Sequence, residues 1–369
     1  MMRDDRIERL ARVLTEYSME VRPGDSVVLS GGVLALPLLR AAYRSTLALG
    51  GNPAIEVLVP EVLEILLSEG SDEQLATINP FERIGSEQAD AYLRVSASEN
   101  TRAMTAIAPA RQQAYARARA DVGARRMARA ASGELRWSST VYPTQAHAQE
   151  AEMSLGEYEE FIAAAGWLDD PDPVARWRAV GAEQARLIDW LTPKQEVHVV
   201  APDTDLRVKI AGRSWINSDG HRNFPSGEIF VGPVEDSVEG HIRFSFASIV
   251  QGREVDDIHL WFEQGKVVRA EAGKNQEFLD AMLNTDAGAR YLGEFAFGTN
   301  DNISRFTRNT LFDEKMGGTV HMALGAGYPD SGSQNRSAIH WDLIRDLRGG
   351  GEVWVDGELF EKDGKIVVK

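Results

Sequence analysis

The hydrophobic period of this chain changes near residue 190, and that change limits the folds open to it. Before it, apolar residues recur at helical spacing, as in RIERLARVL at residues 6–14. After it, apolar and polar residues alternate, as in LRVKI at residues 206–210, which is typical of strands with one buried face. We therefore predict an α/β domain over residues 1–190 and an α+β domain rich in antiparallel sheet over residues 191–369.

The first domain is predicted to contain a βαβ unit. A helix at 6–17 is followed by a strand at 26–29, a helix at 33–49 and a strand at 54–59. Gly31 and Gly32 are interpreted as a turn. They lack the third glycine of a dinucleotide fingerprint and the Lys-Ser/Thr of a phosphate-binding loop, which favours simple chain reversal over nucleotide binding.

Three more helices are predicted, and one is unusual in charge. They span 108–131, the segment after the capping pair Ser154 and Glu157, and 173–191. The helix at 108–131 carries a run of arginines in an acidic chain. We interpret the run as a solvated face, with pairing to an acidic surface of a partner subunit as the alternative.

Charge and composition exclude several classes of function. The chain has 369 residues, with 40 basic and 56 acidic side chains and a formal net charge of −16, which opposes binding to nucleic acid. It has no cysteine, so histidine and carboxylate are the only strong metal ligands left. The charged N-terminus does not resemble a secretion signal, and no apolar run of about 20 residues occurs. We expect a cytoplasmic protein with neither membrane nor nucleic-acid partners.

The second domain contains an inventory of possible metal ligands. They are Glu228 in PSGEIF, Glu294 in GEFAFG, Glu314 in FDEK, His321 in VHMALG, and His340 with Asp342 in HWD. Imidazole and carboxylate bind divalent ions, and a bridging carboxylate can hold two of them about 3.5–4 Å apart. Residues i and i+2 of a strand share a face, so His340 and Asp342 can act together while Trp341 points into the core. The inventory indicates a two-metal site and a hydrolase.

The strings around these residues resemble a known family. NFPSGEIFVGPVEDSVEG, GEFAFGTN, LFDEKMGGTVHMALGAGYP and NRSAIHWD are similar to the thermophilic aminopeptidase T family of metallopeptidases, strongly over about 205–360 and more diffusely before that. The resemblance implies a cytoplasmic homodimer that binds two divalent ions, zinc, cobalt or manganese, and acts on peptides with a free N-terminus. It implies six metal ligands, Glu228, Glu294, Glu314, His321, His340 and Asp342, and an essential tyrosine, Tyr328.

The mechanism that the resemblance implies is hydrolysis of the N-terminal peptide bond. A metal-bridging water would attack the carbonyl, with Glu294 acting as ligand or as general base and Tyr328 stabilising the oxyanion. His221 and His241 are candidates for orienting the ligands, although a surface role is the simpler interpretation. The acidic residues Glu235, Asp236 and Glu239 are interpreted as a solvated turn, with recognition of the substrate amine as the alternative.

Two other functions compete with this interpretation. One is a ring-opening dioxygenase of the same fold with a single iron(II), which needs only two histidines and one carboxylate. The other is a non-catalytic metal-binding homologue, which would have lost a ligand or the tyrosine. The complete set of carboxylates favours the two-metal peptidase.

Overall fold

The computed structural model describes residues 2–250 and 253–368, so the outermost residues 1 and 369 of the two predicted domains lie outside the described residues. The chain divides into two compact units, one of Met1–Arg176 with Gly220–Pro225 and one of Trp177–Asp219 with Ser226–Lys369. The predicted domain boundary at residue 190 stays a prediction.

The first unit is built on a parallel sheet in the order β2-β1-β3-β4-β8. Its elements are α1 (Asp4–Arg12), a π-helix (Val13–Ser18), β1 (Ser26–Gly32), a 3₁₀ turn (Val33–Ala35), α2 (Leu36–Ala48), β2 (Asn52–Leu58), α3 (Pro60–Glu69), α4 (Asp72–Ala76), α5 (Pro80–Gln88), β3 (Ala91–Ser96), a 3₁₀ turn (Ala103–Ala106), α6 (Pro109–Ala131), β4 (Arg136–Val141), α7 (Gln145–Glu150), α8 (Leu155–Ala165) and β8 (Asn223–Phe224). The parallel pairing of β1 and β2 across α2 is the predicted βαβ unit.

The predicted turn at Gly31 and Gly32 is wrong, because both residues belong to β1. The reason is packing rather than chain reversal. A Cβ atom on Gly31 would lie 3.1 Å from the Cβ atom of Val95 on the neighbouring strand. The glycine thus permits close approach between β1 and β3. In the sequence, a glycine of this kind cannot be distinguished from one that marks a turn.

The arginine-rich helix α6 is solvated as expected, with none of its residues buried, but several of its arginines also pair within the first unit. Arg119 donates to Glu82 at 2.8 Å, Arg129 donates to the carbonyl of Ala89 at 2.8 Å, and Arg111 donates to the carbonyl of Leu67. These partners lie on or just after α3 and α5, so three of the arginines fasten neighbouring helices of the same unit.

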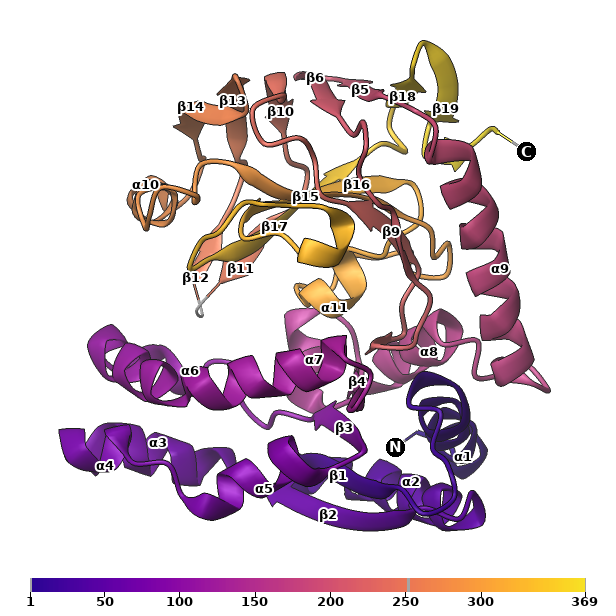
Figure 1. The fold of residues 1–369 in the computed structure, drawn as a ribbon, viewed down its shortest axis with the longest axis vertical. Helices are drawn as coiled ribbons and strands as arrows, with labels where there is room; N and C mark the ends of the chain where they lie inside the picture. The colour runs from indigo at the N-terminus through magenta and orange to yellow at the C-terminus, as the bar shows by residue number, and fades with distance from the viewer. Residues whose placement is uncertain (1, 251–252, 369) are drawn as a thin grey trace. The chain divides into compact units, whose positions relative to one another are not determined.

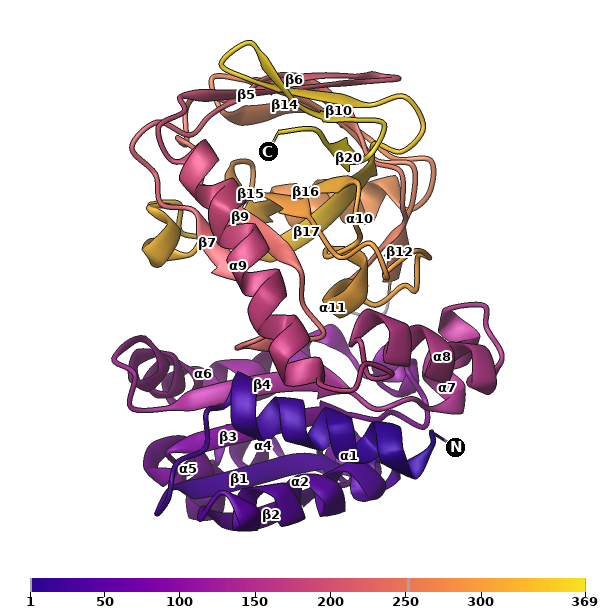
Figure 2. The same ribbon diagram turned by 90° about the vertical axis from the view of Figure 1, so that its right-hand side faces the viewer.

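The second unit packs two antiparallel sheets face to face, which Figure 2 shows as two layers. Their orders are β14-β13-β10-β6-β5-β18-β19-β20 and β17-β16-β15-β9-β7. The elements are α9 (Pro173–Leu191, which begins in the first unit), β5 (Glu196–Ala201), β6 (Thr204–Lys209), β7 (Ile216–Ser218), β9 (Glu228–Val231), β10 (Glu239–Arg243), β11 (Ser248–Val250), β12 (Arg253–Val255), β13 (His259–Glu263), β14 (Lys266–Glu271), α10 (Gln276–Leu283), β15 (Leu292–Gly298), α11 (Thr310–Asp313), β16 (Thr319–Gly325), a 3₁₀ turn (Pro329–Ser331), β17 (His340–Asp346), β18 (Glu352–Val355), β19 (Glu358–Lys362) and β20 (Lys365–Ile366).

Alternating residues of the two sheets build the core of this unit. Val197 and Val199 of β5 face Phe295 and Phe297 of β15 within one cluster of buried apolar side chains. Helix α9 runs beside the sheets (Figure 1), and Trp190 near its end packs against the same core. The predicted fold class, an α/β part followed by a part rich in antiparallel sheet, is confirmed.

No helix in the described ranges is long and apolar enough to cross a membrane.

Candidate metal centre

The six predicted ligands converge in the second unit. Glu228 begins β9, Glu294 lies on β15, His321 on β16, His340 and Asp342 on β17, and Glu314 follows α11. The four strands are consecutive in one sheet, in the order β17-β16-β15-β9. Five of the six candidate ligands are therefore brought to one face of a single sheet, and Glu314 approaches them from the end of α11.

Cross-strand register leaves space between the ligands. Glu294 is paired with Ala323, which is in turn paired with Asp342, and His321 is paired with Ala296. Directly paired residues point to the same face of a sheet. An alanine therefore lies between Glu294 and Asp342, and the short methyl group leaves room above the sheet that a longer side chain would fill.

A β-bulge aims Glu294 at this face. The register of β15 against β16 shifts between Leu292 and Glu294, so Gly293 is the additional residue. The bulge allows Leu292 and Phe295 to face the apolar core while Glu294 faces the ligands. Only glycine fits at the bulge, because a Cβ atom on Gly293 would lie 2.4 Å from the carbonyl oxygen of Ala326.

The backbone before Glu228 is held by a similar close approach. Gly227 has a φ of +120°, and a Cβ atom there would lie 2.6 Å from the Cβ atom of Asn300. Asn300 also donates from its side-chain amide to the carbonyl of Ser226 at 2.9 Å. On the other side, Gln184 of α9 donates to the carbonyl of Glu228 at 2.5 Å. The string PSGE is thus a rigid approach to the first ligand.

His321 lies between two groups of carboxylates. Its Nε2 atom is 3.2 Å from Oε1 of Glu294 and 3.3 Å from Oε2 of Glu228. Possible ligand atoms of Glu228, Glu314 and His321 all lie within 4.8 Å of one another, and so do those of Glu294, His321 and Asp342. These two groups are the candidate metal positions.

His340 extends the second group. Its Nε2 atom is 3.4 Å from Oδ1 of Asp342 and 3.9 Å from Oε2 of Glu294. Its Nδ1 atom lies 2.7 Å from the carbonyl oxygen of Ala326, which fixes the proton on Nδ1 and directs Nε2 toward the carboxylates. Trp341 points to the opposite face, as predicted, and is 1% exposed.

Sequence reasoning missed one charged group in this centre, Lys315. Its side chain is 0% exposed, its Nζ atom lies 3.3 Å from Oε1 of Glu228, and it donates to Oε1 of Glu314. The string FDEK contains the residue, but lysine is almost always exposed, so sequence alone favours a surface position. Its place immediately after a predicted ligand is the only signal that could have identified it.

Burial governs the protonation of the acids. Burial raises the pKa of Glu314 to about 8, although the Lys315 ammonium opposes the rise. Burial also raises the pKa of Glu294, with its hydrogen bond to His321 acting in the opposite direction.

The two histidines hold protons more tightly than usual. Burial would lower the pKa of His321, but the hydrogen bond to Glu294 and the surrounding carboxylates outweigh it and raise the pKa to about 9. In the same way the bond to Asp342 outweighs burial and raises the pKa of His340 to about 10. Without a bound ion, protonated imidazoles therefore balance the carboxylates at neutral pH.

These residues fit a divalent metal. Oε2 of Glu228 and Oδ1 of Asp342 are buried, and their contacts with the histidine rings, at 3.3 and 3.4 Å, are ion pairs without hydrogen-bond geometry. Buried polar atoms rarely stay unpaired, because water or an ion satisfies them. A cation bound among them would pair these atoms and replace the positive charge of the two imidazolium groups. The assignment of the six residues as ligands stays a prediction.

Tyr328 lies at the edge of the centre. Its ring is 5.3 Å from that of His340 and 5.5 Å from that of Phe230, measured between centroids. Burial raises the pKa of the phenol, and the charge of Glu294 adds to the rise. Tyr328 therefore keeps its proton at neutral pH and is able to donate a hydrogen bond.

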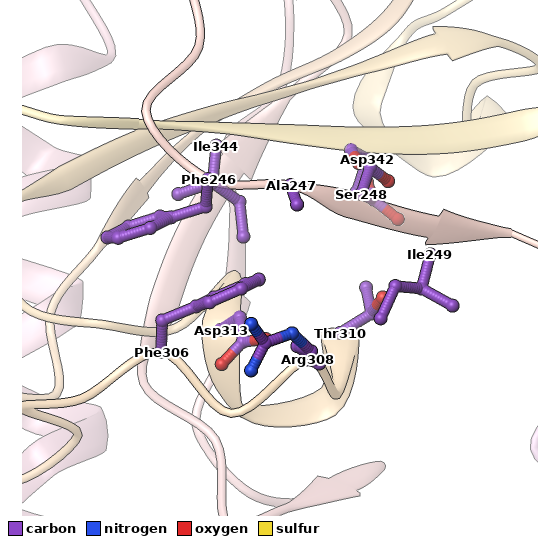
Figure 3. Close-up of a pocket in the computed structure, with 10 residues that line it drawn as sticks. All are labelled: Phe246, Ala247, Ser248, Ile249, Phe306, Arg308, Thr310, Asp313, Asp342 and Ile344. Atoms are coloured by element: carbon purple, nitrogen blue, oxygen red, sulfur yellow. Dashed lines mark hydrogen bonds between the residues drawn. The ribbon is translucent and has the colours of Figure 1, made fainter. Parts of the chain in front are cut away.

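A small pocket adjoins Asp342 (Figure 3). Its walls include Phe246 and Phe306, whose rings stack 4.8 Å apart. Arg308 and Asp313 line the same pocket. Buried Asp313 accepts hydrogen bonds from the backbone and hydroxyl of Thr307, which hold the loop that presents Phe306 and Arg308.

The other candidate residues have structural partners. His221 packs against the ring of Tyr17, and His241 packs against His259 on the other sheet of the second unit. Glu235 is not the solvated turn residue that we expected, because it pairs with Arg213 and accepts a hydrogen bond from the backbone of Gln334 at 2.6 Å.

Comparison with known proteins decides the family. The family of thermophilic metalloproteases designated M29 matches residues 3–367. The chain belongs to the M29 family. The predicted resemblance to the aminopeptidase T family, and with it the prediction of a metallo-aminopeptidase, is confirmed.

This M29 protein matches a curated relative and a solved structure over most of its length. It is 27% identical to Aminopeptidase 2 of Geobacillus stearothermophilus over 97% of this chain and 95% of the relative. It shares its fold with the solved structure of AmpT from Thermus thermophilus, with a TM-score of 0.86, 24% identity and coverage of 98% and 99% of the two chains. A dioxygenase of Pseudomonas putida KT2440 that acts on 2,5-dihydroxypyridine is more distant, with a TM-score of 0.59, 14% identity and coverage of 100% and 99%.

Proposed function

We propose that this M29 aminopeptidase hydrolyses the N-terminal peptide bond of peptides at a centre of two divalent ions. The observation that carries the proposal is the convergence of two ligand groups about His321, one with Glu228 and Glu314 and the other with Glu294 and Asp342. His340 completes the second group. Zinc, cobalt and manganese all accept this mixture of imidazole and carboxylate ligands.

Divalent ions bound there would lower the pKa of a water molecule, polarise the scissile carbonyl and anchor the free amine of the substrate. Glu294 is our candidate for the general base. Its carboxylate is buried among the candidate ligands, 3.2 Å from Nε2 of His321, which would place it beside the attacking water. It would take the proton of the attacking water and pass it to the leaving amine.

Tyr328 would stabilise the oxyanion that forms on the carbonyl oxygen when water adds to the carbonyl carbon. Its phenol remains protonated because burial raises its pKa, and its ring lies beside His340. A hydrogen-bond donor that is already in position forms a stronger bond as negative charge develops on the oxygen. The stacked rings of Phe246 and Phe306 would contact the substrate in the pocket next to Asp342.

The test is release of amino acids by the full-length protein loaded with zinc, cobalt or manganese. We expect release from unblocked dipeptides, none from N-acetylated dipeptides, and two metal equivalents per chain in the same sample. Glu294→Ala and His340→Ala should lose turnover with unchanged circular dichroism, whereas His241→Ala on the other sheet should retain it. Unchanged turnover in the first two variants would contradict the site assignment.

The same experiment separates the alternatives. A mononuclear iron dioxygenase would bind one iron(II) and consume oxygen with a dihydroxypyridine, and a non-catalytic homologue would bind metal without releasing amino acids. The four carboxylates around two histidines exceed what an iron facial triad requires, which favours the peptidase.

We also propose that the protein is a cytoplasmic homodimer, as the family resemblance implies. Support for a dimer comes from exposed apolar side chains on β2, an edge strand, and on the helices that follow it: Ile55, Val57, Val62, Ile65 and Phe81. An edge strand with exposed apolar residues is a common site of association. We call these five residues the β2 surface.

A further inference from the structure

Lys315 is the fixed cation of the centre. Its backbone carbonyl accepts a hydrogen bond from Asn300 at 3.0 Å, and its own amide donates to the carbonyl of Phe312 at 3.0 Å. The side chain is 0% exposed, so its ammonium group is available to neither solvent nor substrate. Its position is therefore set by the fold, and it acts on the reaction only through the groups it contacts.

Those contacts are confined to one side of the centre. Among the described residues, the ion pairs of Lys315 are with Glu228 and Glu314, both in the first ligand group. In each of these ion pairs the Oε1 atom of the carboxylate contacts the ammonium group. The ion pairs of His340, by contrast, are with Glu294 and Asp342, both in the second group.

A buried ammonium group weakens cation binding beside it in two ways. It occupies one oxygen of each carboxylate, which leaves Glu228 and Glu314 one oxygen each for a metal. It also repels a divalent ion held by the same carboxylates, and in a buried site this repulsion is little screened. Lys315 makes no ion pair with the second group among the described residues, and its charge reaches Asp342 there only as a weaker, longer-range effect.

We propose that Lys315 makes the two metal positions unequal, so that the position formed by Glu228 and Glu314 binds its ion more weakly than the one formed by Glu294, His340 and Asp342. This inference rests on the proposed two-metal function. Lys315 is thus a positioning residue, and the ion beside it is the exchangeable one.

Calorimetric titration of the full-length, chelator-treated protein with Mn²⁺ tests this asymmetry. We expect two binding steps of different affinity in the wild type. Lys315→Met, which keeps length but removes charge, should tighten the weaker step by about tenfold or more, equivalent to about 1.4 kcal/mol, and change the tighter step by less than about threefold. Lys315→Arg, which keeps the charge, should retain the wild-type pattern.

A weaker step that is unchanged or weakened in Lys315→Met would overturn the inference. His340→Ala gives a second test that does not require substitution of the buried lysine, because it should weaken only the tighter step. Loss confined to the weaker step in that variant would also overturn it. Binding of a single ion by the wild type would instead contradict the proposed two-metal function, so the two failures are distinguishable.

Discussion

At the scale of single residues, buried charge is concentrated in the metal centre, where almost every charged group has a counter-charge. Lys315 and the two histidines balance the carboxylates there. Glu361 on β19 is the contrast, since it is 1% exposed and both of its carboxylate oxygens lack a hydrogen-bond partner. The proposed role of the centre is to bind a cation, whereas Glu361 is accommodated because burial raises its pKa and favours the protonated form.

Tyr328→Phe should separate metal binding from oxyanion stabilisation. The phenol is a donor beside the centre, and loss of one such donor typically lowers kcat by about 10²–10³. We expect this loss with two metal equivalents still bound, measured by steady-state kinetics and elemental analysis of one sample. Tyr43→Phe, in the first unit, serves as control. A fully active Tyr328→Phe enzyme would remove the tyrosine from the mechanism.

Glu361→Gln should make stability less dependent on pH. Burial raises the pKa of Glu361 from 4.5 to about 8, and the charges of Asp301 and Asp346 add to the rise. The folded protein therefore binds a proton that the unfolded chain releases, so the contribution of Glu361 to stability is fully present below about pH 4.5 and is lost as pH rises through about 8.

The amide cannot ionise, so the free energy of unfolding of Glu361→Gln should exceed that of wild type by about 4 kcal/mol at pH 8 and match it near pH 4.5. Urea denaturation at the two pH values measures the difference, with exposed Glu263→Gln as control. An equal advantage at both pH values would show that titration is not the cause.

At the scale of elements, regular helices and strands can be predicted from the sequence, whereas the bulge that directs Glu294 toward the other candidate ligands cannot. Periodicity predicts α9 and the βαβ unit well, because amphipathic helices and buried strands follow directly from apolar spacing. It does not predict the bulge at Gly293 or the place of Gly31 within β1, because a glycine needed for close packing resembles one needed for a turn. The burial of Lys315 could not be predicted for a related reason, because it depends on contacts with residues that are distant in sequence.

The six candidate ligands could be named in advance because each stands in a distinctive string. Their distribution into two groups could not be predicted. It follows from the pairing of β15 with β16 and of β16 with β17, which places Ala323 between Glu294 and Asp342. Strand register is a property of the folded sheet, and the local pattern of each strand does not reveal its partner.

Ala323→Leu should impair metal binding without unfolding the sheet. The larger side chain would enter the space between Glu294 and Asp342, and leucine is tolerated in strands. We expect apparent metal affinity to fall by at least about tenfold, measured by calorimetry. Ala270→Leu, on β14 of the other sheet, is the matched control. Normal affinity in Ala323→Leu would mean that the metals do not occupy this face.

At the scale of the whole molecule, helix α9 bears on where the domains divide. We propose the boundary at residue 190, yet Gln184 bonds the carbonyl of Glu228 and Trp190 packs on the second unit's core. Fragments 173–369 and 191–369 test it by thermal denaturation. Equal melting temperatures place the boundary at 190. A lower melting temperature for the shorter fragment would overturn the proposal and move the boundary to the start of α9.

Phe81→Glu should disrupt the proposed homodimer. Phe81 is 79% exposed and is the most exposed large apolar residue of the β2 surface. A charge there would have to be buried on association, which is costly without a partner. Light scattering after size-exclusion chromatography should report a monomer, whereas Val268→Glu in the second unit should remain dimeric. A dimeric Phe81→Glu protein would exclude this surface as the interface.

Because the candidate ligands on β9, β15, β16 and β17 come from four separate strands, the site can form only late in folding. The six side chains approach one another only when β9, β15, β16 and β17 have paired in register, and they span residues 228–342. If these residues bind metal as we propose, metal binding requires the completed sheet. A newly made or misfolded chain would hold the candidate ligands apart, so we expect peptide hydrolysis only once the sheet has formed.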